Sequence, residues 1–310
     1  MTDLEVAEVV EICTKVFGAE PVACRQIRHG NTKDTWLITL EDGVDVVLQA
    51  DGARLRDEVE LTRMIGDQTR VPVASVIDAG EYASRVYFIS DLIRGDNLHT
   101  VLTELPADRQ HDLAYTIGAH LARLHNTFSF DGHGRLSVQD GTLRANEPQS
   151  VRPMLSNLLE SGLAAFPDSM QDLRQPIRDA ADFSVFPSGS PALLYPWDYR
   201  PGNMLVRDGG VEGIIDWGEP RSGPRLLSVA KAEYTFIDWY DLPELSDPFY
   251  EGYSSIASLE WSEPQRRIAR LLGIVRSAVD SNGVVTMPKY PMVNQAEAIR
   301  FHRENIEELC

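Results

Sequence analysis

Lysine is scarce in this sequence. Four lysines accompany 25 arginines and 47 acidic residues in a chain of 310, so the net charge is −18. A field of this sign repels phosphates at long range, which disfavours nonspecific binding to nucleic acid or anionic lipid. We therefore expect neither a nucleic-acid nor a membrane partner, and any phosphate ligand must be held by a metal ion or a few fixed cations. The composition suits either a protein adapted to high salt or an acidic protein from a GC-rich genome.

Cysteine is also rare. Cys13, Cys24 and Cys310 are far apart and odd in number, which argues against a disulfide framework and against a C-x-x-C metal site. No apolar run approaches the roughly 20 residues of a membrane span, and the first residues lack the basic segment of a secretory signal. The sequence contains no G-x-x-x-x-G-K-[ST], H-E-x-x-H or G-x-S-x-G motif. We expect a cytoplasmic protein whose chemistry depends on other residues.

Short β-branched segments and one helix fill the first 90 residues. The predicted strands are 21–28, 35–40, 44–50, 73–79 and 86–90, and the helix between them is 53–65. From Asp96 onward the pattern is mostly helical, interrupted by a β island at 192–195, 204–206 and 213–215. We therefore predict an α+β fold with a small antiparallel β lobe over residues 1–92 and a larger, mainly helical lobe over 93–310. The cleft between two such lobes is the usual place for a ligand.

The stretch from Trp197 to Val206 carries the clearest chemical signal. Asp198 and Asn203 flank a turn that contains Pro-Gly, a strand begins after Asn203, and a second strand runs into Asp216. A hairpin turn at 208–210 would place Asn203 and Asp216 side by side at one sheet edge. A carboxamide and a carboxylate supply oxygen donors that suit Mg²⁺, which takes few protein ligands besides phosphates. Asp198, at the loop tip, would lie within reach of a hydroxyl group, so this pattern indicates phosphoryl transfer.

This stretch resembles the catalytic loop of the aminoglycoside phosphotransferase and small-molecule kinase family, a branch of the protein-kinase-like fold. The family pattern H-G-D-x-x-P-G-N, then two apolar residues and later G-x-x-D-W, corresponds here to PWDYRPGNML at 196–205 and GIIDW at 213–217. The resemblance spans roughly residues 20–280. It includes a nucleotide-covering loop at 30–36, a helix acid in the small lobe, a lobe connector at 87–95 and a helix end at 121–125.

The resemblance implies an enzyme that moves the γ-phosphoryl group of ATP or GTP to a hydroxyl of a small molecule, with Mg²⁺ as cofactor. It also implies that Asp198 is the catalytic base and that Asn203 and Asp216 are the metal ligands. The nucleotide-binding residues that it implies are Lys33, Gln49, Glu58, Ser90 and Leu92.

The sequence departs from the family pattern at three places. Pro196 and Trp197 replace the His-Gly pair before the catalytic acid, and the family's G-D-P-x-x-D segment loses both acids at 223–230. Gln49 stands where the third strand should carry a lysine, and an amide supplies no charge. Lys33, in the nucleotide-covering loop, is the best candidate for a substitute cation.

The loss of that lysine leaves the helix acid, Glu58, without its expected partner. It could pair with Arg28 or Arg56, or it could lie on the helix surface as a solvated acid. Gln49, Pro196 and Pro224 also favour an alternative function, a catalytically weakened kinase-like protein that binds nucleotide or metabolite. We prefer the phosphotransferase, because decay should not spare the acid and both metal positions.

The sequence says less about the identity of the acceptor. Acidic residues in the C-terminal helices could line a pocket for a cationic acceptor, or they could form a solvated acidic face. These residues are Glu233, Asp238, Asp241, Glu244, Asp247 and Glu251.

Overall fold

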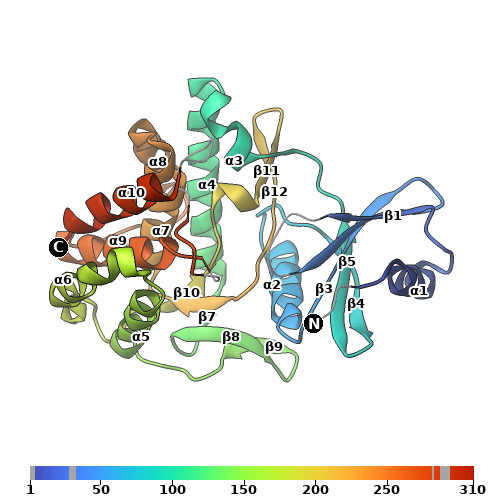
Figure 1. The fold of residues 1–310 in the computed structure, drawn as a ribbon, viewed down its shortest axis with the longest axis horizontal. Coiled ribbons are helices and arrows are strands. Elements are labelled where there is room, and N and C mark those ends of the chain that lie inside the picture. Colours follow the sequence, from blue (N-terminus) through green and yellow to red (C-terminus); the bar gives the residue numbers. More distant parts are fainter. Residues whose placement is uncertain (1–3, 28–32, 281–282, 287–293) are drawn as a thin grey trace.

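The computed structural model describes residues 4–27, 33–280, 283–286 and 294–310. Arg28 and the expected start of the nucleotide-covering loop at 30–32 lie outside the described residues. A twisted sheet with two helices and a larger, mainly helical group lie side by side along the long axis of the molecule (Figure 1). The predicted α+β class is confirmed.

The first sheet has five antiparallel strands in the order β1-β2-β3-β5-β4. Its strands are β1 (Ala23–Ile27), β2 (Asp34–Thr39), β3 (Asp45–Asp51), β4 (Val76–Tyr82) and β5 (Arg85–Asp91). Two helices accompany it, α1 (Val6–Phe17) before β1 and α2 (Leu55–Gln68) between β3 and β4. Each predicted strand overlaps an observed one, so the β-β-β-α-β-β order is confirmed.

The two faces of this sheet are covered by different helices. Along β3, Val46, Leu48 and Ala50 are buried and the residues between them are half-buried, as the alternation of side chains in a strand requires. The buried face packs against α1 in an apolar cluster that includes Ile12 and Trp36. A separate apolar cluster joins α2 to the other face of β5. The half-buried residues of β3 therefore lie on the face that carries α2.

Among the described residues, the larger group contains most of the helices and eight short strands. The helices are α3 (Leu98–Val101), α4 (Ala107–Thr127), α5 (Val151–Ala164), α6 (Arg174–Ala180), α7 (Arg225–Phe236), α8 (Ser246–Ser254), α9 (Glu263–Ser277) and α10 (Gln295–Glu307). The strands are β6 (Asp96–Asn97), β7 (Ser129–Phe130), β8 (Gly134–Gln139), β9 (Thr142–Ala145), β10 (Ala192–Tyr195), β11 (Met204–Arg207), β12 (Gly210–Ile214) and β13 (Arg221–Gly223). Helix α4 packs against α8, and α7 packs against α9, around one large apolar core.

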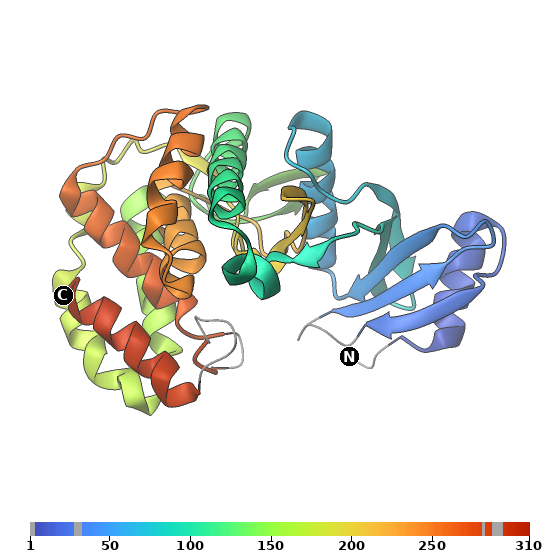
Figure 2. The same cartoon turned by 90° about the horizontal axis from the view of Figure 1, so that it is seen from above.

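Helix α2 connects the two groups. It lies between the first sheet and the larger group in both views (Figure 1, Figure 2), and it contacts β4 and β5 on one side and β8 and β9 on the other. The backbone N–H of Val138 donates to Asp57 Oδ1 of α2 at 2.9 Å. A residue on this helix can therefore interact with both groups. The predicted lobe boundary at 92/93, just after β5, stays a prediction.

The β content of the larger group exceeds the prediction. The three predicted strands of the β island are present, but β10 belongs to a five-stranded sheet of order β7-β10-β13-β8-β9, whereas β11 lies between β12 and β6 in a three-stranded sheet. The prediction missed the β8–β9 hairpin, although Asp140-Gly141 between alternating apolar residues is a hairpin signal. A 3₁₀ segment, Asp168–Leu173, directly precedes α6. Across the described residues, no helix is both long and apolar enough to cross a membrane.

Candidate functional site

The β11–β12 hairpin brings two candidate metal ligands to the same end of a sheet. Its strands pair Met204 with Ile214, and the backbone N–H of Ile215 donates to the carbonyl oxygen of Asn203 at 2.9 Å. Asn203 precedes one strand and Asp216 follows the other, so the pairing places them beside each other. The hairpin predicted from the sequence is confirmed.

The loop that carries Asp198 is held by hydrogen bonds from several elements. The side-chain amide of Asn203 donates to the carbonyl oxygen of Asp198 at 3.0 Å, which closes the five-residue turn. Asn97 of β6 donates to the carbonyl of Gly202 at 2.7 Å. The Tyr199 hydroxyl donates to a backbone carbonyl of α4 at 2.8 Å. These contacts fix the backbone of the loop and leave the Asp198 side chain 36% exposed.

Asp198 and Asp216 face a common space. Both line one small cavity, together with Trp197 and Trp217. The nearest ion-pair partner of Asp198 is Arg200, whose Nε lies 3.7 Å from Asp198 Oδ1. A carboxylate that is partly exposed and not tightly paired can accept a proton from a bound hydroxyl group.

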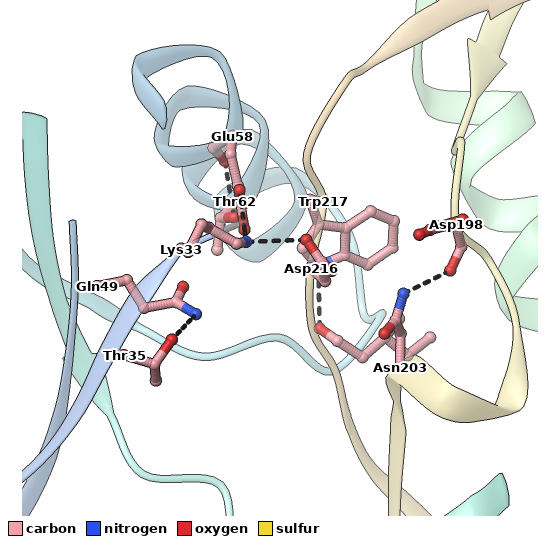
Figure 3. A network of polar contacts seen from close by, with 10 residues as sticks. Lys33, Thr35, Gln49, Glu58, Thr62, Asp198, Asn203, Asp216 and Trp217 are labelled. Atoms are coloured by element: carbon pink, nitrogen blue, oxygen red, sulfur yellow. Dashed lines mark hydrogen bonds and ion pairs between the residues drawn. The ribbon is translucent and has the colours of Figure 1, made fainter. Parts of the chain in front are cut away.

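Lys33 joins the small-lobe helix to the hairpin. Its Nζ lies 2.7 Å from Glu58 Oε1, 2.8 Å from Glu58 Oε2 and 2.8 Å from Asp216 Oδ1 (Figure 3). The Lys33 and Glu58 side chains are 12% and 5% exposed, whereas the Asp216 side chain is 40% exposed. An ammonium group has three N–H donors, so three carboxylate oxygens fully occupy it. The result is a mostly buried ion-pair triad on the α2 face of the sheet.

The charges in this triad depend on one another. Burial lowers the pKa of Lys33, but the carboxylates of Glu58 and Asp216 more than offset it, and the pKa rises above its ordinary value. Burial raises the pKa of Glu58, and Lys33 opposes that rise. Lys33 is therefore a fixed cation at neutral pH. It is a local positive charge of the kind that a phosphate site in this acidic chain would need.

This pairing corrects one prediction. Glu58 is neither a solvated surface acid nor a partner of Arg56, which pairs instead with Glu81; Arg28 lies outside the described residues. Lys33, directly before β2, pairs with Glu58 in place of the lysine that was expected on β3.

Gln49 lies on the same sheet face as Lys33. It is opposite Thr35 in the β2–β3 register, and its amide donates to the Thr35 hydroxyl at 3.3 Å. Positions 33 and 35 are two residues apart in an extended segment, so their side chains share one face. Figure 3 shows the Gln49 side chain on the same side as the Lys33 ammonium. Gln49, where a lysine was expected, therefore lies near Lys33 on one sheet face.

The available oxygen atoms fit a divalent cation. Because Asn203 donates its amide nitrogen to a backbone carbonyl, its amide oxygen faces the other way, and it makes no hydrogen bond within the described part of the chain. The second carboxylate oxygen of Asp216 is likewise unpaired among the described residues. The described residues contain no group of three or more His, Cys, Asp or Glu side chains placed for a metal. Mg²⁺ does not require one, since it keeps waters and binds phosphates.

The backbone at Asp216 aims its carboxylate. Asp216 has φ +61°, a left-handed conformation that aspartate tolerates better than most residues. The indole N–H of Trp217 donates to the carbonyl of Ile214 at 2.9 Å, which closes this turn. A Cβ at Gly218 would lie 3.3 Å from Glu58 Oε2, so glycine lets the turn approach the triad closely. The sequence analysis did not single out Gly218.

Lys231 is a second residue that the sequence analysis missed. It lies on α7, is 6% exposed, and its Nζ donates to the carbonyl oxygen of Trp197, directly before Asp198. This contact supports the loop where Pro196 and Trp197 replace the family's His-Gly pair. A lysine flanked by apolar residues within a helix, in a chain with four lysines, was the available signal.

Other predicted positions lie apart from the triad. Ser90 is buried at the end of β5 and donates to the carbonyl of Asp91 at 3.2 Å, and Leu92 is half-buried just after that strand. No hydrogen bond between described residues joins Ser90 or Leu92 to the triad. Their assignment to nucleotide binding stays a prediction.

The comparisons with known proteins agree with this geometry. A model of the phosphotransferase enzyme family (APH) matches residues 23–267. The aminoglycoside phosphotransferase APH(4)-Ia has a similar structure, with a TM-score of 0.69 at 15% identity over 98% of each chain. The spectinomycin phosphotransferase APH(9)-Ia, solved with ADP and spectinomycin, has a TM-score of 0.65 at 15% identity over 99% of this chain and 98% of its own.

A third structure extends the fold beyond antibiotic-modifying proteins. A putative fructosamine-3-kinase from Thermobifida fusca has a TM-score of 0.60 at 18% identity, over 98% of this chain and all of its own. Identities this low support the fold and leave the substrate open. The family match covers more than half of the sequence and includes the loop, the hairpin and the triad. The chain therefore belongs to the phosphotransferase enzyme family and has its two-part, protein-kinase-like fold.

Proposed function

We propose that the chain transfers the γ-phosphoryl group of ATP or GTP to a hydroxyl group of a small molecule. The observation that carries this proposal is that Asp198, Asn203 and Asp216 meet at one end of a hairpin, beside a buried lysine. Phosphoryl transfer requires little covalent chemistry from a protein, because positioning and charge stabilisation do most of the work.

Asp198 is the proposed base. As the acceptor oxygen bonds to the γ-phosphorus, its proton passes to the Asp198 carboxylate. The bond from the γ-phosphorus to the bridging oxygen breaks, and the nucleoside diphosphate leaves. Arg200 lies 3.7 Å from Asp198, so its positive charge is close to the atoms that react in this step.

Asn203 and Asp216 are the proposed ligands of Mg²⁺. They would hold the ion through the Asn203 amide oxygen and the unpaired Asp216 oxygen. Held there, the ion would supply positive charge that offsets the charge of the nucleotide phosphates. The Asn203 side chain would then serve two purposes, because its nitrogen also ties down the Asp198 backbone.

Lys33 is the proposed cation for the nucleotide phosphates. All three of its N–H donors are engaged, two with Glu58 and one with Asp216. A phosphate oxygen can replace the half-exposed Asp216 more easily than the buried Glu58. Nucleotide binding would thus release Asp216 for the metal while Glu58 keeps Lys33 in place.

The alternative, a weakened binding protein, rests on Gln49, Pro196 and Pro224. Lys33 compensates for Gln49, because it supplies a cation on the same sheet face. Lys231 compensates for Pro196, because it supports the loop from α7. Both observations favour the active phosphotransferase.

The test measures nucleotide binding and phosphoryl transfer separately. We expect Asp198→Asn to keep Mg²⁺–ATP affinity and to lower transfer, or nucleotide hydrolysis without an acceptor, by about 10²–10⁴-fold, the usual contribution of a positioned base. Asp208→Asn, at the exposed hairpin turn, is the matched control and should leave both unchanged. Absence of Mg²⁺-dependent nucleotide binding in the unmodified protein would refute the proposed function.

A further inference from the structure

Three cations surround the indole ring of Trp197. The Cζ atom of Arg221 lies 3.9 Å from the ring centroid, Lys231 Nζ lies 4.5 Å from it, and Arg276 Cζ lies 4.8 Å from it. They come from β13, α7 and the end of α9. We call these three side chains the Trp197 cation cluster. Stacking on an indole holds guanidinium groups in fixed planes, which prepares them to bind planar or tetrahedral anions.

The negative charge around this cluster falls short of its positive charge. Arg221 lies 3.4 Å from Glu219, an acid that also pairs with Arg54 at 3.3 Å. Within the described part of the chain, Lys231 and Arg276 have no ion-pair partner. Such an excess of buried and half-buried positive charge is unexpected in a protein of net charge −18, because like charges in a poorly solvated site repel each other.

Hydrogen-bond donors in the cluster are unused. The Nε atoms of Arg221 and Arg276 are buried and have no partner among the described residues. The pKa of Lys231 is lowered to about 8, chiefly by burial; the charge of Asp198 opposes this effect and the nearby arginines add to it. Buried donors without acceptors cost free energy, and native structures rarely keep them without a reason. An anion that accepts from both guanidinium groups would remove this cost.

The position of the cluster links it to the acceptor. Trp197 directly precedes Asp198, and both line the cavity that Asp216 shares. Of the carboxylates, Asp198 is the one whose charge acts most strongly on Lys231. A small molecule whose hydroxyl group lies at Asp198 would reach the cluster by extending along Trp197.

The acidic residues that could have favoured a cationic acceptor are partly neutralised. Glu233 pairs with Arg266 at 3.2 Å and with Arg270 at 2.9 Å. Asp238 also pairs with Arg270, at 2.9 Å. These two acids thus balance arginines inside the protein and cannot attract a cationic ligand at full strength.

We propose that the acceptor carries an anionic group, a carboxylate or a phosphate monoester, which the Trp197 cation cluster binds while the acceptor hydroxyl lies at Asp198. This inference rests on the proposed function, because the ligand is an acceptor only if the chain transfers a phosphoryl group. The opposing explanation is that the cluster only supports the catalytic loop and binds no ligand.

The first experiment measures anion binding without turnover. Acetate and inorganic phosphate are titrated in the presence of saturating Mg²⁺–ADP, with chloride replaced so that ionic strength stays constant. We expect saturable binding of at least one anion, with Kd raised at least tenfold by Arg276→Gln and by Arg221→Gln. Arg178→Gln, which removes an exposed pair with Glu160, is the control and should bind as the unmodified protein does. Absence of saturable binding, or equal binding by all variants, would overturn the inference.

The second experiment compares four matched three-carbon compounds as ligands and acceptors: glycerate, glycerol 3-phosphate, glycerol and 3-amino-1,2-propanediol. We expect one of the two anionic compounds to bind best, with glycerate and glycerol 3-phosphate distinguishing a carboxylate site from a phosphate site. Arg276→Gln should remove that preference and leave Mg²⁺–ADP affinity unchanged. Preference for the amine or the neutral compound would contradict the inference. Anion binding without any Mg²⁺–nucleotide binding would refute the proposed function and leave the anion site standing.

Discussion

Lys33 offers the most informative perturbation, because it holds together both the fold and the proposed nucleotide site. Lys33→Met keeps the length of the side chain and removes its charge. Glu58, 5% exposed in its side chain, would then be a buried carboxylate without a partner. Removing one member of a buried ion pair costs about 3–5 kcal/mol. Asp216 is 40% exposed and screened by water, so most of this cost belongs to the Glu58 pair.

The effect on nucleotide binding has a different origin. A hydrogen bond to a charged group contributes about 1.5–3 kcal/mol, so loss of the ammonium should raise the Kd of Mg²⁺–ATP by roughly 10- to 150-fold. The double variant Lys33→Met/Glu58→Gln separates the two effects. It leaves no unpaired buried charge, so the free energy of unfolding should recover to within about 1 kcal/mol of the original. The weakened nucleotide affinity should not recover.

Urea unfolding and nucleotide titration at matched ionic strength measure the two quantities. Lys15→Met, an exposed position on α1, controls for the loss of one lysine and should change neither. The reasoning would be refuted if Lys33→Met bound Mg²⁺–ATP as tightly as the unmodified protein. Recovery of nucleotide affinity in the double variant would also contradict it. Removal of the negative charge of Glu58 would then be enough for binding, and the ammonium group of Lys33 would not be needed.

Three further predictions address the metal, the strand position and pH. Asp216→Ala should abolish the Mg²⁺ dependence of nucleotide binding and leave the unfolding midpoint almost unchanged, because the carboxylate is half-exposed; calorimetry with and without Mg²⁺ checks this. Gln49→Lys should add little alone but restore at least tenfold of the affinity lost in Lys33→Met, because both positions share one sheet face; no restoration would place Gln49 outside the site. Acid should destabilise the fold between pH 7 and 5, because burial lowers the pKa of three histidines, which stay neutral in the folded protein at pH 5. In the unfolded chain the same histidines are protonated below about pH 6.5, so each of them lowers the free energy of unfolding by about 2 kcal/mol by pH 5. Asp238, whose pKa burial raises to about 6, offsets about 1 kcal/mol of this loss; chemical unfolding at both pH values checks the sign, and a protein more stable at pH 5 would contradict it. These histidines, with folded pKa values of about 4, 3 and 4, are His120, His125 and His302.

Local sequence patterns determined much of the fold. The alternation of apolar residues along β3 and the apolar stripe of α2 are properties of a few consecutive residues, and the structure has both elements at the predicted places. The same holds for the site loop, since Asp198 and Asn203 are five residues apart and the turn between them needs only local contacts. The hairpin that places Asp216 beside Asn203 follows from its Asp-Gly-Gly turn. The β8–β9 hairpin was equally local, and its signal went unused.

Side-chain partners that are distant in the chain depended on the tertiary structure alone. Lys33 and Asp216 are 183 positions apart, and no periodicity or spacing could match the cation to its acids. The sequence indicated only that a lysine was missing from the strand and that another stood nearby. Packing of α2 between the two groups of elements decided that Glu58 is buried and meets Lys33. In the same way, the packing of α7 and α9 against the loop that carries Asp198 brought Lys231 and Arg276 to Trp197, because a buried charge finds its partner through the fold rather than along the chain.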